Sequence, residues 1–380
     1  MHPNKRVHFF CYMTIDKITK YIDSWAPKGI AWERDNVGLQ VGSLKQVAKN
    51  ILLSLDVNEY VVEDAIKKKC NLIISHHPLL FNPIRKITSG DKTSELIIKL
   101  IKNDITVYSA HTNLDFTKDG VSFQLAKKLG LNSIKFLKNI SENLSKLVVF
   151  VPAGFTEKVA EAIHNNGAGI IGEYTNCSFR VIGKGTFRGS DKSNPTVGKK
   201  GKLEFVDEVR LEVLVNTFDL PNVISAMKEA HPYEEVAYDI YPLKNENVNY
   251  GMGAIGNLVT ELTQSQFLDY VSKKLGIKNF RFSQSRNKKI KTVAVCGGSG
   301  SDLLNTAIQA NADAFITADI KYHTFQDAEN RILLIDAGHY ETEIFILDEI
   351  ERRLKNFITE SKIEIFKFKG TTNPICFYNN

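Results

Sequence analysis

The sequence has few of the residues that would indicate several common classes of protein. Its 380 residues include 5 cysteines, which are scattered and show no CxxC spacing. This pattern is typical of a reducing compartment and argues against a zinc site built from thiolates. No apolar run reaches the roughly 18 residues that a membrane helix needs. The short apolar stretch at residues 7–12 is followed by no signal-peptide cleavage site. We therefore expect a cytoplasmic protein without a membrane span.

The sequence also has no large excess of charge of one sign. Lys and Arg total 49 against 43 Asp and Glu, which gives a net charge of +6 without a long basic block. Binding to nucleic acid is therefore not expected, although a mildly positive surface could attract an anionic small molecule. Apolar residues make up 43% and charged residues 24% of the chain. This composition is that of a globular protein and excludes general disorder.

Segments with helix and strand patterns alternate over residues 13–140 and again over 251–380. Short apolar runs such as 51–55, 72–74 and 332–335 predict buried strands, and the periodic segments between such runs predict helices. This alternation predicts an α/β fold with a mainly parallel sheet that is covered on both faces. We expect the two segments to pack together as one split domain.

The pattern between residues 145 and 250 is different. Strand and helix patterns follow one another there in the order β-α-β-β-α-β, which is the ferredoxin-like order. The Gly-rich stretch at 183–201 is expected to form a mobile loop between the two halves of this segment. The sequence therefore predicts a split α/β domain that is interrupted by a ferredoxin-like α+β insert.

Histidines are few, but several of the 9 follow predicted strands in the company of a second ligand-type residue. In open α/β sheets ligands bind beyond the carboxyl ends of the strands, so these side chains could meet in one crevice. Imidazole and carboxylate ligands suit zinc, iron or manganese. The pairs are His76 with His77, His111 with Asp115, and His339 with Glu343.

The spacing within these pairs favours a shared metal site. His339 and Glu343 are four residues apart at the start of a predicted helix, so they lie on one helical face. There they can bind one metal ion or two neighbouring ions. Pro78 favours a strand end after His76 and His77, so both rings can face the same site. A carboxylate between two metals could bridge them and hold an activated water.

Other polar positions stay open from the pattern alone. Asp56 and Asp336 also follow predicted strands and could reach the same crevice. His323 could contact a ligand or the substrate, and a purely structural role has comparable weight. The turn at 297–300, Gly-Gly-Ser-Gly, could offer backbone N–H groups to an anion, but it lacks the Lys and Ser/Thr of a P-loop. A tight turn is the favoured interpretation.

The outer segments resemble the signatures of the Nif-three-like family, whose members are labelled dinuclear metal-binding proteins or GTP cyclohydrolase type 2 homologues. The resemblance covers both segments in the expected order and is specific as a combination. The matching segments are 32–42, 54–56, 74–78, 109–115, 297–300, 317–323 and 336–343.

The resemblance implies two divalent metal ions in each subunit. The implied ligands are His76, His77, Asp115, His339 and Glu343, with Glu343 as the bridge between the metals. His111 would lie beside the pair and, with Glu343, take part in catalysis.

The resemblance also bears on domains and assembly. The segment 145–250 looks like the PII- or CutA-like domain of the longer bacterial members, and such members resemble toroidal homohexamers. Family members start near Met13, so residues 1–12 would be an N-terminal extension, or Met13 the true start.

Three functions stay open at this point. The leading hypothesis is a metal-dependent hydrolase of the GTP cyclohydrolase type 2 kind, in which an activated water attacks a nucleotide or a related heterocycle. A phosphoesterase could use the same metals on another substrate. The third hypothesis is a metal-binding regulatory or assembly protein, not an enzyme, whose insert senses a small molecule.

Overall fold

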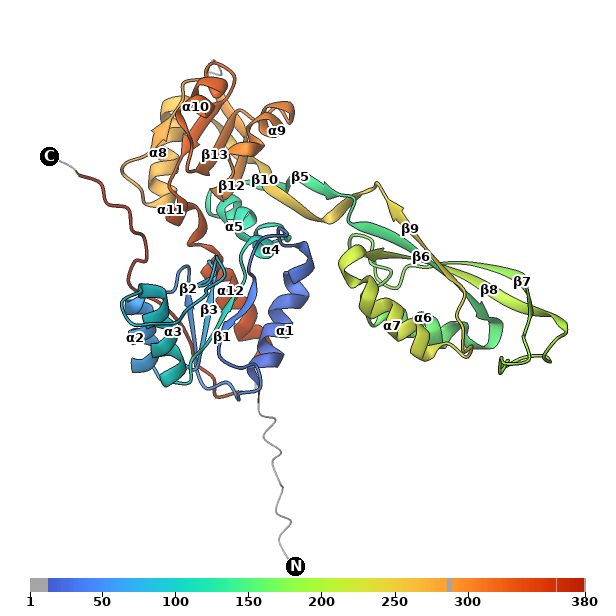
Figure 1. Cartoon of the computed structure of the whole chain (residues 1–380). Helices are drawn as coiled ribbons and strands as arrows, with labels where there is room; N and C mark the ends of the chain where they lie inside the picture. Colours follow the sequence, from blue (N-terminus) through green and yellow to red (C-terminus); the bar gives the residue numbers. More distant parts are fainter. Residues whose placement is uncertain (1–12, 286–288, 360, 379–380) are drawn as a thin grey trace, which may run out of the picture. The chain divides into compact units, whose positions relative to one another are not determined.

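The protein divides into two compact units along the chain. The structure, a computed structural model, describes residues 13–285, 289–359 and 361–378 (Figure 1). The described residues of Met1–Lys138 and Gly251–Asn380 form the first unit, and Asn139–Tyr250 form the second. The N-terminal extension predicted at residues 1–12 lies outside the described residues. In the described part of the chain, no helix is long and apolar enough to cross a membrane.

The first unit contains a five-stranded sheet among its described residues, in the order β1-β4-β3-β2-β15. Strands β4, β3, β2 and β15 are parallel, and β1 runs antiparallel to β4. The strands are β1 (Gly38–Val41), β2 (Ile51–Ser54), β3 (Leu72–Ser75), β4 (Thr106–Ser109) and β15 (Ile365–Lys367). The flanking helices are α1 (Ile15–Trp25), α2 (Glu59–Lys67), α3 (Lys92–Lys102) and α12 (Ile346–Phe357).

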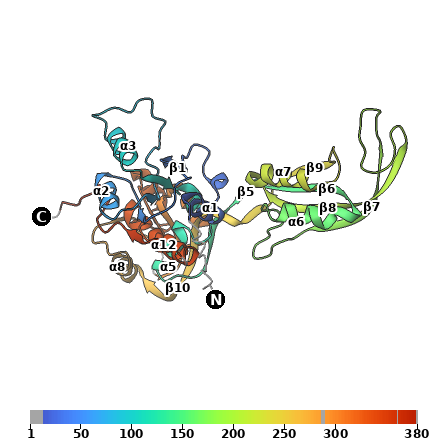
Figure 2. The same ribbon diagram turned by 90° about the horizontal axis from the view of Figure 1, so that it is seen from below.

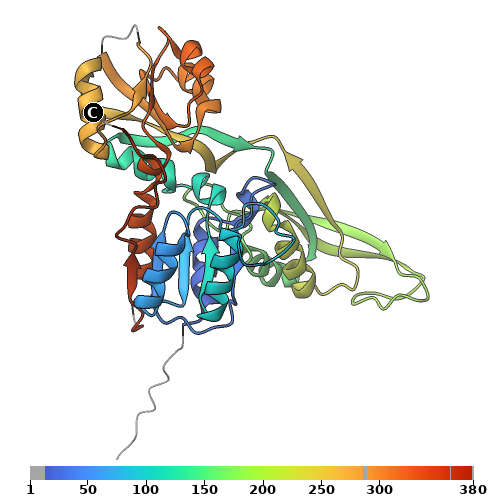
Figure 3. The ribbon, with the colours of Figure 1, turned by 60° about the vertical axis from the view of Figure 1, so that its left-hand side comes forward.

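Helices cover both faces of this sheet, which explains why its central strands are apolar throughout. All four residues of β2 are buried. Successive strand side chains point to opposite faces, so Ile51 and Leu53 pack with α1 and α12, whereas Leu52 packs with α2 and α3. The helices on the two faces of the sheet are visible in Figures 1 and 3. Helix α1 begins after Thr14, whose hydroxyl accepts a hydrogen bond from the backbone N–H of Lys17 at 3.4 Å.

A second sheet of the first unit has six described strands, in the order β11-β14-β13-β12-β10-β5. Strands β12, β13 and β14 are parallel, whereas β11 and β10 run antiparallel to their neighbours β14 and β12. The strands are β5 (Asn132–Ser141), β10 (Glu246–Thr263), β11 (Arg281–Phe282), β12 (Lys289–Ser299), β13 (Ala314–Ala318) and β14 (Leu333–Asp336). The covering helices are α5 (Val121–Lys128), α8 (Gln264–Leu275), α9 (Leu304–Gln309) and α10 (Tyr322–Ala328).

The first sheet is mainly parallel, as predicted, but the unit contains a second sheet of mixed pairing, so the described residues form a mixed α/β fold with several sheets. The two halves of the chain exchange strands: β15 joins the first sheet beside β2, and β5 joins the second beside β10. Alternating strands and helices predict parallel pairing within each half, but they do not specify which sheet a strand enters.

The second unit is built on a four-stranded antiparallel sheet in the described residues, in the order β7-β8-β6-β9. Its core lies between the sheet and two helices (Figure 1). Along the chain the elements are β6 (Leu144–Pro152), α6 (Thr156–His164), β7 (Phe179–Arg188), β8 (Leu203–Asn216), α7 (Leu220–Ala230) and β9 (Tyr238–Leu243).

The Gly-rich stretch at 183–201 is a loop only in its second part, which corrects the sequence prediction. Gly183 and Gly185 belong to β7 and lie opposite Glu208 and Val206 of β8. Figure 2 shows β7 and β8 side by side with the connecting loop at their far end. Glycine weakens a strand, so its presence predicted a loop, whereas ten pairs along β7 and β8 hold this segment in the sheet.

Candidate metal centre

The histidines and carboxylates singled out in the sequence lie together in the first unit. His76 and His77 come directly after β3, and His339 and Glu343 lie in α11 (His339–Glu343), which follows β14. In the described residues, two groups could hold a metal ion, with ligand atoms within 4.8 Å of one another. The groups are His76, His77 and His111, and His77, His339 and Glu343. Asp115 of α4 (Thr112–Asp115) joins them, with Oδ1 at 3.6 Å from Nε2 of His76.

The end of β3 brings both tandem histidines to one site. The backbone N–H of His76 donates to Ser54 at 3.2 Å, and that of His77 donates to Leu55 at 2.8 Å. Beyond this point the strand ends before Pro78. The two ring centroids are 4.9 Å apart, so the rings do not diverge as they would on a continuing strand.

Glu343 is the central carboxylate of the arrangement. Its Oε1 lies 3.2 Å from Nε2 of His339 and 3.7 Å from Nε2 of His76, and its Oε2 lies 3.1 Å from Nε2 of His77. The side chain is buried. The predicted helix that begins at His339 ends at Glu343, and α12 starts at Ile346. The short helix α11 therefore presents this carboxylate to three imidazoles from two different strand ends.

Each imidazole is oriented by an acceptor on its Nδ1 atom. A carboxylate or carbonyl oxygen accepts a hydrogen bond, so the ring nitrogen facing it carries the proton, and the Nε2 lone pair is left for the site. The Nδ1 partners are Asp56 for His77 at 2.8 Å, Asp35 for His111 at 2.9 Å, Asp319 for His339 at 2.6 Å, and the Ala110 carbonyl oxygen for His76 at 2.8 Å.

Two buried polar atoms show that the residues fit a metal ion. Nε2 of His76 and Oδ1 of Asp115 are buried and have no hydrogen-bond partner in the part of the chain that the structure describes. Nε2 of His77 and Nε2 of His339 face each other at 3.3 Å, so both atoms point into one site. Buried polar atoms without partners are costly. A divalent cation bound by imidazole and carboxylate would satisfy all of them.

The carboxylates around the histidines make the site favour positive charge. Burial lowers the pKa of His77, but hydrogen bonds to Asp56 and Glu343 outweigh it and raise the pKa to about 10. The same balance, with Glu343 and Asp319, raises the pKa of His339 to about 9. Burial raises the pKa of Asp115. Without a cation the site thus holds protons, so metal binding must displace them.

Several residues around the site were missed or left open by the sequence. Asp35 accepts from His111 and, at 2.5 Å, from the hydroxyl of Thr112. Burial raises the pKa of Asp35, but these hydrogen bonds lower it to about 2. Asp35 lies inside the family-like segment 32–42, but no predicted strand end marked it. Thr372 donates to Oδ2 of Asp56 at 2.5 Å, and nothing in the sequence indicated that contact.

The structure does not bring every candidate to the metal groups. Asp336 forms an ion pair with Arg281 and accepts from the backbone N–H of Ile320 at 3.1 Å. His323 is exposed, and its Nδ1 lies 2.9 Å from Oε1 of Gln326. Both sets of contacts are structural. Gly298 of the predicted tight turn closes β12 against the site, because a Cβ atom there would collide with Oε1 of Glu343.

The fold and the site together define a family. Residues 13–374 match the family described as Duf34/NIF3 (NGG1p interacting factor 3), so the chain belongs to this family and the resemblance noted in the sequence is confirmed. A Bacillus subtilis protein named "GTP cyclohydrolase 1 type 2 homolog" is 39% identical over 365 residues, covering 95% of this chain and 98% of the relative. A Halalkalibacterium halodurans protein of the same name is 38% identical over 364 residues, covering 95% and 98%.

Solved structures show the same relationship. The crystal structure of a Bacillus cereus protein related to NIF3 matches with a TM-score of 0.80 and 37% identity, covering 97% of this chain and 100% of the other. A Staphylococcus aureus protein matches with a TM-score of 0.75 and 30% identity, covering 96% and 99%. Both likenesses extend over the two units of the chain.

Proposed function

We propose that this protein is a dinuclear-metal-dependent hydrolase of the GTP cyclohydrolase type 2-like kind, acting on a nucleotide or a related heterocycle. The observation that carries the proposal is the buried Glu343 carboxylate within 3.7 Å of the Nε2 atoms of His76, His77 and His339. The names of the relatives support the substrate class, because they refer to GTP cyclohydrolase.

In this proposal two divalent ions, zinc, iron or manganese, are held by a set of five side chains. Glu343 would contribute to both positions, because its two oxygens lie within 3.7 Å of Nε2 of His76, His77 and His339. When bound, such a pair of ions would supply Lewis-acid chemistry, which lowers the pKa of water and polarises the bond to be attacked. The ligands are His76, His77, Asp115, His339 and Glu343.

His111 is the residue proposed to move the proton. Its Nδ1 is fixed by both oxygens of Asp35, at 2.9 and 3.0 Å, so proton exchange takes place at Nε2. Asp35 keeps its negative charge at neutral pH, since its pKa is about 2, and this charge stabilises an imidazolium. With GTP, a water that attacks C8 of the purine ring would pass its proton to Nε2 of His111.

The ligand assignment is tested by two substitutions. We expect His339→Ala and Glu343→Gln each to lose stoichiometric metal, because each removes a donor atom that faces the other ligands at 3.3 Å or less. Elemental analysis of the purified protein measures the metal content. His323→Ala is the control, because that ring contacts Gln326 outside both groups. Two tightly bound metals remaining in both variants would defeat the assignment.

Activity is tested separately from metal binding. Metal-loaded protein is incubated with GTP, other nucleotides, phosphoesters and purine-like heterocycles, and the products are identified by mass spectrometry. Ring opening supports the proposal. Release of phosphate alone would replace it by a phosphoesterase, and no turnover of any compound would favour a non-enzymatic regulatory protein.

The proposal extends to the second unit and to assembly. The element order β-α-β-β-α-β of the second unit and its sheet order β7-β8-β6-β9 support a ferredoxin-like insert of the PII or CutA type. Exposed apolar side chains in the loop between β3 and α3 support self-association, which we propose to be a toroidal homohexamer. These side chains are Phe81, Ile84 and Ile87. Analytical ultracentrifugation measures the mass, and a monomer would contradict this part.

A further inference from the structure

The second unit contains a cavity of about 620 Å³ that plays no part in the metal centre. It lies beside the ends of β7 and β8 that meet the connecting loop, and the loop and the segment 232–237 complete its wall. This volume is in the range of small-molecule sites. Three aromatic side chains line it, namely Phe150, Phe187 and Tyr233.

The loop between β7 and β8 is fastened over the cavity by specific hydrogen bonds. The backbone N–H of Asn194 donates to Oε1 of Glu234 at 2.9 Å, and the hydroxyl of Thr196 donates to the carbonyl oxygen of Pro232 at 2.8 Å. At the loop base, the N–H of Gly201 donates to Gly189 at 2.7 Å. These hydrogen bonds hold the loop in a defined position as a wall of the cavity beside the aromatic side chains.

Negative charge predominates in the lining. The lining contains three carboxylate residues, Glu208, Glu234 and Glu235, and one guanidinium residue, Arg188. Glu208 has no ion-pair partner among the described residues. Gly185 across the sheet leaves room for the Glu208 carboxylate, because a Cβ atom there would collide with it. The glycine in β7 thus has a specific consequence, which is the placement of a carboxylate over the cavity.

A tyrosine hydroxyl also faces a carboxylate at this cavity. The oxygen of Tyr233 is buried, and it lies within hydrogen-bonding reach of the Glu208 carboxylate. Burial and the Glu208 carboxylate raise the pKa of Tyr233 to about 12, so the phenol stays neutral. Its ring lies 6.3 Å from that of Phe187, centroid to centroid. A neutral phenol beside a carboxylate can offer its ring face and its oxygen to a positive group.

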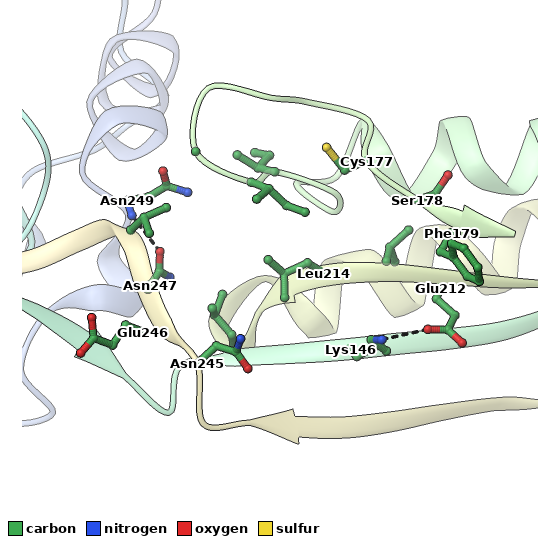
Figure 4. Close-up of a pocket in the computed structure, with 16 residues that line it drawn as sticks. Lys146, Cys177, Ser178, Phe179, Glu212, Leu214, Asn245, Glu246, Asn247 and Asn249 are labelled. Carbon is green, nitrogen blue, oxygen red and sulfur yellow. Dashed lines mark hydrogen bonds and ion pairs between the residues drawn. The ribbon is translucent and has the colours of Figure 1, made fainter.

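A second cavity in this unit, of about 450 Å³, is lined by polar groups that pair with one another (Figure 4). Lys146 and Glu212 in its lining form an ion pair at 2.9 Å. The amide of Asn247 is likewise engaged, since it donates to Asn216 at 3.0 Å and accepts from the N–H of Asn249 at 3.0 Å. Because these polar groups already have partners in the protein, they do not point to a ligand in this cavity.

We infer that the cavity at the β7–β8 loop is a binding site for a small organic cation that carries an amine or guanidinium group. Aromatic faces attract such a cation, and the carboxylates of Glu208 and Glu234 neutralise it. An anion would meet three carboxylates and is excluded. Arg188 is the protein's own competitor for these carboxylates. The site goes beyond the proposed hydrolase function and does not depend on it.

The test uses the full-length protein and agmatine, which carries one ammonium and one guanidinium group. Isothermal titration calorimetry at low ionic strength is expected to show one site per chain. Glu208→Gln and Phe187→Leu should each weaken binding about tenfold or more, and Arg188→Gln should strengthen it. Asp207→Asn is the matched control: it neutralises the neighbouring residue of β8, whose carboxylate pairs with Lys184 at 2.7 Å and does not line the cavity.

The outcomes separate this site from the metal centre. His339→Ala, which is expected to lack metal, should bind agmatine with unchanged affinity. Melting temperatures show whether each variant is folded, and Arg188→Gln gives a gain that a misfolded protein cannot give. The inference is overturned if agmatine does not bind, if Glu208→Gln and Asp207→Asn bind it equally, or if AMP binds here in its place.

Discussion

At the scale of single residues, the hydrogen-bond partner of Nδ1 in each site histidine determines whether Nε2 is available to the site. Three of the four site histidines have a carboxylate on Nδ1, and the fourth has a carbonyl oxygen. A surface histidine seldom has such a fixed partner, and His323 has a neutral amide. Because the Nδ1 acceptors set the tautomer, they would contribute to the metal affinity of the proposed centre without touching a metal.

Thr372 offers a test of this dependence. Its hydroxyl donates to Oδ2 of Asp56 at 2.5 Å, while Oδ1 of Asp56 accepts from His77 at 2.8 Å. We expect Thr372→Val to lower metal affinity about tenfold, within the range seen for groups behind a ligand, which corresponds to about 1.4 kcal/mol. A competition assay with a chelator of known affinity measures the change.

Thr372→Ser is the control for that prediction, because it keeps the hydroxyl. Its metal affinity should match that of the natural chain. If Val and Ser variants bind metal equally well, the hydroxyl contact does not position His77, and the C-terminal segment has some other role.

The meeting of the candidate ligands could be predicted from the sequence, and the groups behind them could not. His76 and His77 come after β3, and His339 comes shortly after β14, at the carboxyl ends of parallel strands. Asp35 reaches a histidine 76 residues away, and Thr372 reaches a carboxylate 316 residues away. Such contacts leave no local pattern, because they depend on how the loops fold over the sheet edge.

At the scale of elements, β12 approaches the site more closely than any side chain would allow. Gly298 near its end has φ +61, and a Cβ atom would collide with Oε1 of Glu343 and lie 3.1 Å from Nε2 of His339. Gly276 after α8 has φ +71 but open space around its Cβ position. The two glycines therefore share a backbone conformation and differ in their surroundings.

This pair separates backbone strain from damage to the site. We expect Gly276→Ala and Gly298→Ala each to lower the free energy of unfolding by about 1–2 kcal/mol, because alanine is strained at positive φ. Only Gly298→Ala should also lose metal, since its methyl group displaces Glu343. Urea unfolding and elemental analysis measure the two effects. Full metal content in folded Gly298→Ala would show that Glu343 can move aside.

Element prediction succeeded where burial is uniform and failed where strands are long and mixed. The strands β2 and β3 are buried throughout, so their apolar runs were evident. Strand β10 runs from Glu246 to Thr263 with buried and exposed residues in no strict alternation. Its position follows from pairing with β12 and β5, which the local sequence does not encode.

At the scale of the whole molecule, the two units have separate cores. One hydrophobic cluster is built entirely from residues of the second unit, and the other four described clusters are built from residues of the first. The six candidate site residues all belong to the first unit. The contacts within the chain show where one unit ends and the other begins.

The boundary between the units allows this independence to be tested by excision. Gly251 of β10 lies against the carbonyl oxygen of Lys138 in β5, so the chain leaves the first unit and returns at neighbouring positions. Joining Lys138 to Gly251 through an Asn-Gly turn closes a short hairpin. We expect this shortened chain to fold and to keep the metal content of the full protein, because no candidate ligand and no first-unit core residue is removed.

The excised second unit, expressed as a separate fragment, gives the complementary test. Asn139–Tyr250 expressed alone has its own sheet, two helices and core, so it should unfold cooperatively and bind agmatine without metal. The shortened first unit should bind metal without agmatine, as calorimetry and elemental analysis would show. If the first unit loses its metal when the second is removed while remaining folded, the second unit supplies something to the metal centre that neither core nor ligand placement reveals. In that case the two sites are energetically coupled, and the coupling could be measured as a change in agmatine affinity on metal loading of the full chain.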